Sequence, residues 1–163
     1  MAEFSHFDCD GNSRMVDVSD KEVTQRVAVA SCVVKMQAET AAMIRDQSIA
    51  KGDVLEVARL AAIMGSKQTS SLIPLCHPIA IDSVEIEIQF AEPEEGFERL
   101  RIVAKVKTAG RTGVEMEALT AVSVAGLTVY DMCKSVDREI EIGPTRLEEK
   151  TGGKSGHFRR EKT

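Results

Sequence analysis

The chain of 163 residues is 43% hydrophobic and 29% charged, and its net charge at pH 7 is −5. This composition is typical of a globular protein with one hydrophobic core, and we expect a single domain over residues 1–163. The acidic balance argues against general nucleic-acid binding, which needs surplus Lys and Arg. The absence of Trp also leaves few rings for stacking bases.

No segment approaches the roughly 20 apolar residues that span a bilayer, and the opening stretch MAEFSHFDCDGNSR lacks the apolar run of a signal peptide. We therefore expect a cytoplasmic protein that binds neither membrane nor nucleic acid. The cysteines are scattered without a C-x-x-C pair, which predicts four reduced thiols: Cys9, Cys32, Cys76 and Cys133.

The first half of the chain predicts a strand and two helices. Residues 1–25 are polar and rich in turn formers, and we expect them to be irregular and mobile. The β-branched run at 26–36 predicts a strand, and residues 38–46 predict a short helix. A second helix is expected at 54–68, capped by the Asp53 side chain. Its buried face is predicted from apolar residues at helical spacing: Val54, Val57, Leu60, Ala61 and Met64.

The middle of the chain predicts a constrained loop followed by a hairpin. Pro74 and Pro78 forbid a continuous helix and hold His77 in a constrained connection. Residues 80–91 and 98–108 each alternate apolar and polar side chains, which is the pattern of two half-buried strands. The short polar turn between them predicts a β-hairpin.

A uniformly apolar stretch at 114–137 predicts a long helix, central to the core or to an interface. A last strand is expected at 138–149, before a Gly-rich basic tail at 150–163 that should lack fixed structure on its own. This order of elements predicts an α+β fold, the ferredoxin-like β-α-β-β-α-β plait with an extra helix in its first crossover. Because this fold hosts many unrelated functions, the function must be argued from side chains.

Reactive side chains gather at a few places, and several have a structural explanation beside a functional one. Lys51 can be a solvated residue before a helix cap, and His77 can be a hydrogen-bonded structural histidine. Glu115 and Glu117 stand at the start of a helix, where they can simply complement the positive end of its dipole.

Asp131 and Lys134 interrupt the apolar helix three residues apart, which places them on one face. An ion pair is the simplest explanation. The functional alternative is an acid/base pair, because a lysine in partly apolar surroundings loses its proton more readily and a neighbouring carboxylate can accept or donate one. Proton transfer of this kind is what a ring rearrangement requires.

The GKS sequence of the tail is not a P-loop, because Glu148 stands where that motif needs its first Gly and no helix follows. Lys150 and Lys154 among glycines can instead close over an anionic ligand. No cofactor or metal held by protein ligands is expected, since no Cys/His spacing matches a zinc site and the histidines are scattered: His6, His77 and His157. Mg²⁺ carried with substrate phosphates stays open.

Glu117 and Asp131 lie about 21 Å apart along a continuous helix. One small substrate could hardly touch both within one subunit. Either one end alone is catalytic or the site lies between subunits, and we favour the shared site.

Several long motifs occur in order along the chain: MVDVS, KGDVLEVAR, LIPLCHP, TGVEMEALTAVSVAGLTVYDMCK and GGKSG. Together they resemble the cyclic pyranopterin monophosphate synthase family, also called the molybdenum cofactor biosynthesis protein C family. The resemblance implies a lyase that converts a cyclic dihydro-GTP to cyclic pyranopterin monophosphate and diphosphate. It also implies a homohexamer, a trimer of dimers, with active sites at dimer interfaces.

The resemblance further implies that Asp131 is the acid/base residue and Lys134 a neighbouring catalytic lysine. It implies that the substrate pocket is formed by a larger set: Arg26, Lys51, Leu75, Cys76, His77, Glu115, Met116, Glu117 and Lys150. Basic residues suit a triphosphate, and carboxylates suit the guanidine-like edge of a pterin. Two alternatives compete, a non-catalytic sensor of small ligands and an RNA-binding module, and the acidic charge weighs against the second.

Overall fold

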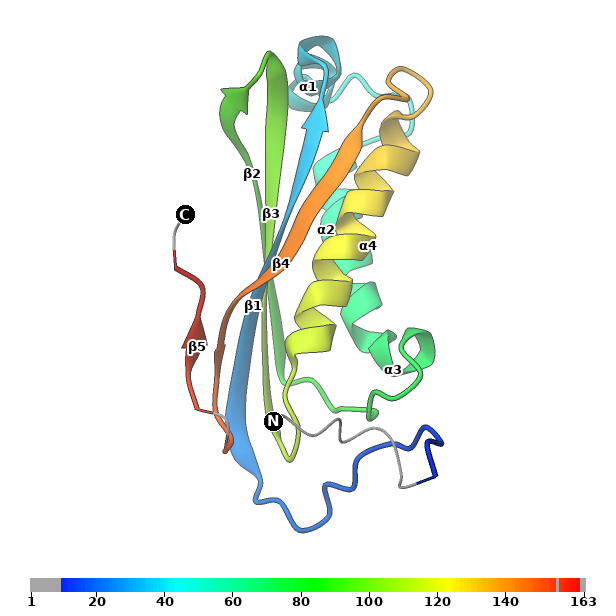
Figure 1. The fold of residues 1–163 in the computed structure, drawn as a ribbon. Coiled ribbons are helices and arrows are strands. Elements are labelled where there is room, and N and C mark those ends of the chain that lie inside the picture. Colours follow the sequence, from blue (N-terminus) through cyan, green and yellow to red (C-terminus); the bar gives the residue numbers. More distant parts are fainter. Residues whose placement is uncertain (1–9, 155, 162–163) are drawn as a thin grey trace.

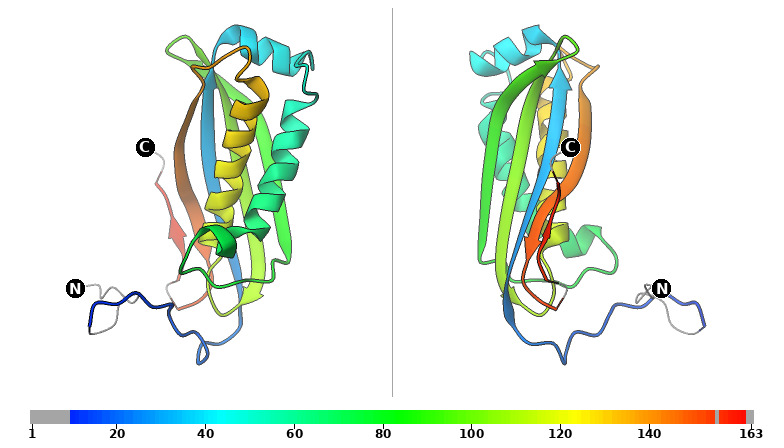
Figure 2. Two further views of the ribbon diagram at one scale, coloured as in Figure 1. Left: turned by 90° about the vertical axis from the view of Figure 1, so that its right-hand side faces the viewer. Right: turned by 60° about the vertical axis from the view of Figure 1, so that its left-hand side comes forward.

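The computed structural model describes residues 10–154 and 156–161, which form two layers, an antiparallel sheet and a set of helices that cover one of its faces (Figures 1 and 2). The elements follow in the order β1 (Thr24–Met36), α1 (Ala38–Arg45), α2 (Val54–Lys67), α3 (Thr69–Leu72), β2 (Ser83–Glu94), β3 (Phe97–Gly110), α4 (Glu115–Cys133), β4 (Glu141–Thr151) and β5 (Phe158–Arg159).

The sheet has the strand order β2-β3-β1-β4-β5, and all neighbouring pairs are antiparallel. The hairpin of β2 and β3 closes where Glu94 pairs with Phe97, as the alternating pattern predicts. Apart from the short β5, this strand order in a β-α-β-β-α-β chain is that of the ferredoxin-like plait. The predicted fold is confirmed, including the extra helix in the first crossover.

The core lies between the sheet and the helices and is aliphatic. The central strand β1 turns alternate side chains toward the helices, and these are buried: Ala28, Ala30, Cys32, Val34 and Met36. Helix α4 crosses the same face and buries small residues against it, among them Ala118, Ala121 and Ala125. Removal of this apolar surface from water is the main force that holds α4 on the sheet.

The buried face of α2 differs from the predicted one, although Val54 is buried as predicted. Ala58, Ala62 and Gly65 are buried, and a Cβ added at Gly65 would lie 2.9 Å from a methyl group of Val124 on α4. The two helices therefore approach too closely for large side chains at their contact. The larger residues of α2 that helical spacing assigned to the core are exposed: Val57 (41%), Leu60 (58%) and Met64 (59%).

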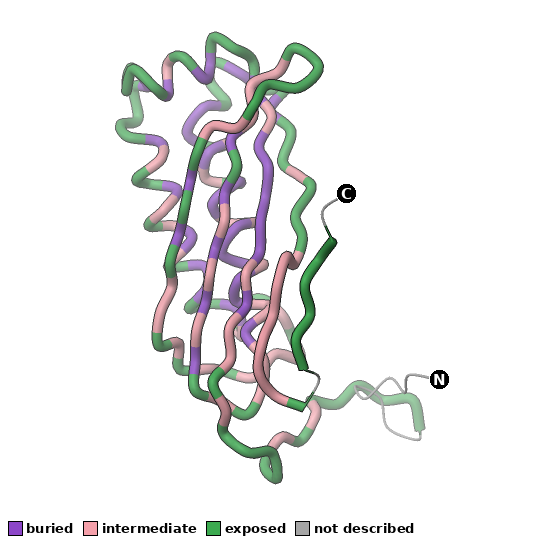
Figure 3. The backbone as a smooth tube through the Cα atoms, turned by 90° about the vertical axis from the view of Figure 1, so that its left-hand side faces the viewer, coloured by how far each residue is buried: buried purple, intermediate pink, exposed green. Residues whose placement is uncertain are grey.

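The tail also has more structure than expected. Phe158 and Arg159 pair with Lys150 and Glu149 of β4 and extend the sheet by a short edge strand (Figure 3). The order comes from the partner strand rather than from the tail sequence itself. The one-turn helix α3, just before the proline-bounded loop, is a second element that the sequence did not predict.

The N-terminal segment contains turns and an isolated bridge over residues 10–23, and β1 begins at Thr24, inside the stretch of 1–25 that the sequence predicts to be irregular. Its mobility stays a prediction. Of the helices in the described ranges, none combines the length and apolar character needed to cross a membrane. Three cysteines are free thiols, Cys32, Cys76 and Cys133, whereas Cys9 and His6 lie outside the described residues.

Candidate active site

A cavity of about 480 Å³ lies at the N-terminal end of α4. Four segments form its walls: the irregular segment before β1, the loop around the two prolines before β2, the connection between β3 and α4, and the first turn of α4. Proline fixes the backbone of the loop, which therefore holds its side chains in place. The lining residues are Val16, Val18, Lys21, Ile73, Leu75, Cys76, His77, Ile79, Thr112, Gly113, Glu115, Met116 and Glu117.

Glu117 supplies a buried carboxyl to this cavity, with 3% of its surface exposed. Burial raises the pKa of Glu117, a hydrogen bond with its own backbone partly opposes that rise, and the charge of Glu115 adds to it. Burial also raises the pKa of the Cys76 thiol, with a smaller contribution from Glu117. The cavity therefore favours neutral forms of both groups, and a neutral carboxyl can both donate and accept a hydrogen bond.

A second cavity, of about 290 Å³, adjoins the first and is basic. Lys21 lines both cavities, and four further cationic side chains line the second: Arg26, Arg111, Lys150 and Lys154. Glu115 is the one acidic side chain of this lining within the described residues, and it forms an ion pair with Lys150 at 3.4 Å. Such a concentration of N–H donors suits the oxygens of a phosphate chain.

A glycine precedes α4 because the Glu115 side chain occupies the space next to the Gly113 backbone. The carboxylate of Glu115 folds back over Gly113, where an added Cβ would overlap its oxygens. Val114 provides no side-chain cap for the helix. The acidic residues of the first turn complement the positive end of the helix dipole. The two carboxyl groups can therefore stabilise the start of the helix and also line the cavity.

The C-terminal end of α4 carries a separate cluster. The Asp131 carboxylate accepts hydrogen bonds from Lys134 Nζ at 2.7 Å and from Lys51 Nζ at 3.0 Å. These bonds hold the pKa of Asp131 below its usual value, and the bond from Lys134 contributes most. The same bond raises the pKa of Lys134. The ion pair that the sequence favours is therefore present, and the Lys134 side chain is 52% exposed.

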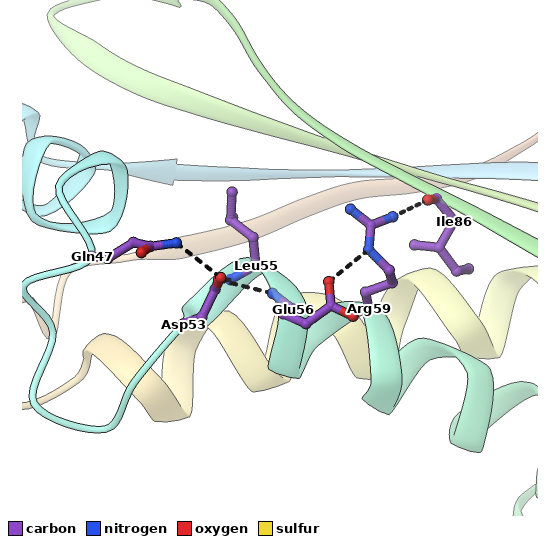
Figure 4. A network of polar contacts seen from close by, with 6 residues as sticks. All are labelled: Gln47, Asp53, Leu55, Glu56, Arg59 and Ile86. Atoms are coloured by element: carbon purple, nitrogen blue, oxygen red, sulfur yellow. Dashed lines mark hydrogen bonds and ion pairs between the residues drawn. The ribbon is translucent and has the colours of Figure 1, made fainter.

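Lys51 reaches Asp131 from the turn between α1 and α2. Lys51 Nζ also donates to the Asp131 backbone carbonyl at 2.6 Å, so it holds both the helix end and the carboxylate. Gly52 gives this turn its left-handed conformation, and Asp53 then caps α2 as predicted. Figure 4 shows the polar network that fixes the start of α2, formed by Gln47, Asp53, Leu55, Glu56, Arg59 and Ile86.

The structure divides the predicted site residues between the two ends of α4. Nine line the adjoining cavities at the start of the helix: Arg26, Leu75, Cys76, His77, Glu115, Met116, Glu117, Lys150 and Lys154. Three cluster at its other end: Lys51, Asp131 and Lys134. The implied place of Lys51 in the substrate pocket thus does not hold within one chain.

Lys21 and Arg111 line the cavities, but sequence reasoning did not select them. Both lie outside helices and strands, where no periodicity indicates which side chains point inward. The available signal was their position next to motifs, since Lys21 closely follows MVDVS and Arg111 directly precedes TGVEMEA.

The adjoining cavities, one basic and one with a buried carboxyl, suit a small anionic ligand. A family model described as the MoaC family matches residues 15–153. A cyclic pyranopterin monophosphate synthase of Syntrophomonas wolfei is 56% identical over 97% of this chain and 99% of its own length. Proteins of the same name from Desulfitobacterium hafniense (57% identical, 98% of this chain, 95% of theirs) and Dinoroseobacter shibae (56%, 99% and 100%) are similarly close. The chain belongs to the MoaC family.

Proposed function

We propose that this chain is a cyclic pyranopterin monophosphate synthase of molybdenum cofactor biosynthesis. It converts (8S)-3',8-cyclo-7,8-dihydroguanosine 5'-triphosphate to cyclic pyranopterin monophosphate and diphosphate, as a cytoplasmic lyase. The observation that carries this proposal is the pair of adjoining cavities at the start of α4, one basic and one with a buried carboxyl. Their chemistry matches the two unlike ends of that substrate.

The basic cavity binds the triphosphate in this proposal. Lys21, Lys150 and Lys154 supply ammonium groups that neutralise phosphate oxygens, and these charges come from three different segments. The guanidine-like edge of the base enters the neighbouring cavity, where Glu117 accepts its N–H groups. Mg²⁺, if it accompanies the phosphates, is a companion of the substrate, and titration with a chelator tests whether turnover needs it.

Asp131 and Lys134 perform the proton transfers of ring remodelling. Their hydrogen bond of 2.7 Å provides an acceptor and a donor side by side, which a rearrangement needs in successive steps. In the isolated chain both groups are exposed and charged. Covering the pair by substrate and by another subunit removes water, and desolvation lowers the preference of both groups for their charged forms.

The proposed active site is shared between two subunits, because α4 spans residues 115–133 and separates the two clusters by about 21 Å. The exposed apolar side chains of α2 support assembly, because an interface that covers Val57, Leu60 and Met64 removes them from water and so stabilises the assembly. A homohexamer built as a trimer of dimers is the proposed assembly.

Mixing two inactive variants tests the shared site. Asp131→Ala and Glu117→Ala subunits, unfolded and refolded together, form hybrid dimers in which one of the two sites is intact. Random mixing is expected to restore about a quarter of the wild-type activity, since half of the dimers are hybrid. Persistent inactivity of a mixture that has demonstrably exchanged subunits would contradict sharing.

Anaerobic incubation of the purified protein with the cyclic dihydro-GTP tests the function itself. Mass spectrometry follows cyclic pyranopterin monophosphate, and a coupled assay follows diphosphate. Equal amounts of both products are the expected result. Tight binding of the substrate with no product would instead support the sensor alternative, which the family membership does not favour.

A further inference from the structure

We propose that Arg26 is a positioning residue whose guanidinium joins the loop before α4 to the glycine-rich tail and so fixes the lysines around the basic cavity. The resemblance implies only that Arg26 completes the substrate pocket. The ligand of the cavity rests on the proposed function, but the joint itself is a feature of the chain. We call the contacts of Arg26 with residues 110–111 and with residue 153 the arginine joint.

The first half of the arginine joint is a pair of hydrogen bonds. Arg26 Nε donates to the carbonyl of Gly110 at 2.9 Å, and Arg26 Nη2 donates to the carbonyl of Arg111 at 3.1 Å. Two donors of the planar fork thus grip consecutive carbonyls where β3 ends and the loop to α4 begins. A lysine ammonium lacks this fixed fork and cannot reproduce the pair in the same geometry.

The second half is a close approach of the tail. A Cβ added at Gly153 would lie 2.7 Å from Arg26 Cζ and 3.0 Å from Nη2, and closer still to Nη1. Only a glycine lets the tail backbone lie this near the guanidinium, and its φ of +73° is also one that glycine adopts without strain. The tail therefore turns where Arg26 stands, between Lys150 and Lys154.

A further hydrogen bond extends the arginine joint to the N-terminal segment. Arg111 Nε donates to the backbone carbonyl of Lys21 at 3.1 Å. Because Arg26 also donates to the carbonyl of Arg111, hydrogen bonds link Arg26, the loop and the segment of Lys21, and the tail lies close against the same guanidinium. Each of these three segments contributes cationic side chains to the basic cavity.

The charges of the cavity explain why such a joint is needed. Lys21, Lys150 and Lys154 repel one another and Arg111 when no anion lies between them, and Glu115 offsets part of this charge. Lys150 is held within β4, but Lys21 and Lys154 lie outside helices and strands, so repulsion would move these two side chains away. The arginine joint holds the backbones, which keeps the lysines convergent before the ligand arrives and lowers the cost of binding.

The chain offers a matched pair of substitutions as a test. Gly153 and Gly156 have nearly the same backbone conformation, with φ of +73° and +69°, but a Cβ at Gly156 meets no heavy atom within 4 Å. Alanine therefore strains both backbones alike, whereas only Gly153→Ala displaces the Arg26 guanidinium. Gly156→Ala is the control for backbone strain.

The first readout is affinity for inorganic triphosphate, measured by calorimetry on the full chain. Gly153→Ala is expected to weaken binding about tenfold, and Gly156→Ala by less than about threefold. In the complete reaction, Gly153→Ala should raise KM for the cyclic nucleotide by a similar factor and leave kcat within about threefold, because the joint acts on positioning and lies far from Asp131. Equal effects of the two alanines would overturn the proposal.

Hydrogen exchange and a second variant separate the joint from the charge of Arg26. Arg26→Lys keeps the positive charge but loses the fork, and we expect faster exchange at 108–113 and 149–154 with the same loss of triphosphate affinity. Wild-type-like exchange and affinity in Arg26→Lys would mean that the charge alone matters, and the joint would be rejected. Failure of the wild-type protein to convert the cyclic nucleotide would reject the proposed function instead, while exchange and triphosphate binding would still report on the joint.

Discussion

The two ends of α4 carry carboxylates in opposite settings. At the first turn Glu117 is 3% exposed, and burial raises its pKa. At the last turn the Asp131 side chain is 58% exposed, and hydrogen bonds from two lysines lower its pKa. Two side chains of the same chemical class thus differ in their readiness to hold a proton because of where one helix places them.

In the proposed function, this difference separates a binding end of α4 from a reactive end. The cavities at the first turn are enclosed by several segments of a single chain, so their shape exists before any partner arrives. The cluster at the last turn lies in the open and consists of three exposed side chains from two segments. When environments push the pKa values of two carboxyl groups apart, the groups suit different tasks, and the tasks we propose here are binding the base and transferring protons.

The largest effect is expected from removing the reactive end. Asp131→Asn and Lys134→Ala should each lower kcat by roughly 10²–10⁴-fold, since each removes a proton acceptor or donor from the proposed chemistry. Inorganic triphosphate should bind both variants as it binds the wild type, because the basic cavity is distant. Glu87→Gln, which alters an exposed carboxylate on β2, serves as the control. Near-normal turnover in either variant would remove that residue from the proposed mechanism.

The fold could be predicted largely because its signals are local and periodic. The hairpin has alternation over two strands, α2 has the Asp53 cap, and α4 has an unbroken apolar run. The face of α2 could not be predicted, because the pattern shows which residues share a side but not how closely α4 approaches. The edge strand at Phe158 was missed for a related reason, since its order depends on pairing with β4.

The position of the candidate site residues relative to one another could be predicted only in part. The motifs identified Glu117, Asp131 and Lys134, and helix geometry separated the first from the other two. The contact of Lys51 with Asp131 links residues 80 positions apart and has no local signal. Lys21 was missed because it lies in an irregular segment, where spacing carries no information about which way a side chain points.

A second prediction tests the binding end through Glu117→Gln. The amide keeps the shape of the side chain but presents an NH2 donor where the carboxyl has an acceptor oxygen, so KM for the cyclic nucleotide should rise by about tenfold or more. Asp131 and Lys134 are untouched, and kcat should change much less. A variant with normal KM and low kcat would assign Glu117 to the reactive end instead.

The same substitution should change the pH dependence of stability in a defined direction. Burial raises the pKa of Glu117 above its usual value of 4.5. Below pH 4.5 the carboxyl is neutral in both the folded and the unfolded chain, so its ionisation does not affect stability there. As pH rises from 4.5 through the folded pKa, the unfolded chain ionises first and the wild type loses stability. Glu117→Gln does not ionise and has no such loss. Denaturant titrations should therefore show the free energy of unfolding of the variant rising relative to that of the wild type across this pH range. Parallel curves would indicate that Glu117 ionises freely.

The smallest catalytic effect is expected from Asp137, which supports the reactive end without belonging to it. Its buried carboxylate accepts hydrogen bonds from the Gln37 N–H at 3.0 Å and the Thr40 hydroxyl at 3.1 Å, and its own N–H donates to the Cys133 carbonyl at 3.0 Å. Asp137 therefore ties the end of α4 to the start of α1, the helix that leads to the Lys51 turn. Asp137→Ala should lower the free energy of unfolding by about 2 kcal/mol, because it leaves buried donors without an acceptor.

Turnover should respond to Asp137→Ala only through this connection. We expect kcat to fall a few-fold, because Lys51 would be slightly displaced from Asp131. Triphosphate affinity at the other end of α4 should stay unchanged. Asp137→Asn retains one acceptor oxygen and should recover most of both stability and kcat. Denaturant titration and steady-state kinetics on the two variants measure this. A loss of triphosphate affinity in Asp137→Ala would mean that the two ends of α4 are coupled rather than independent.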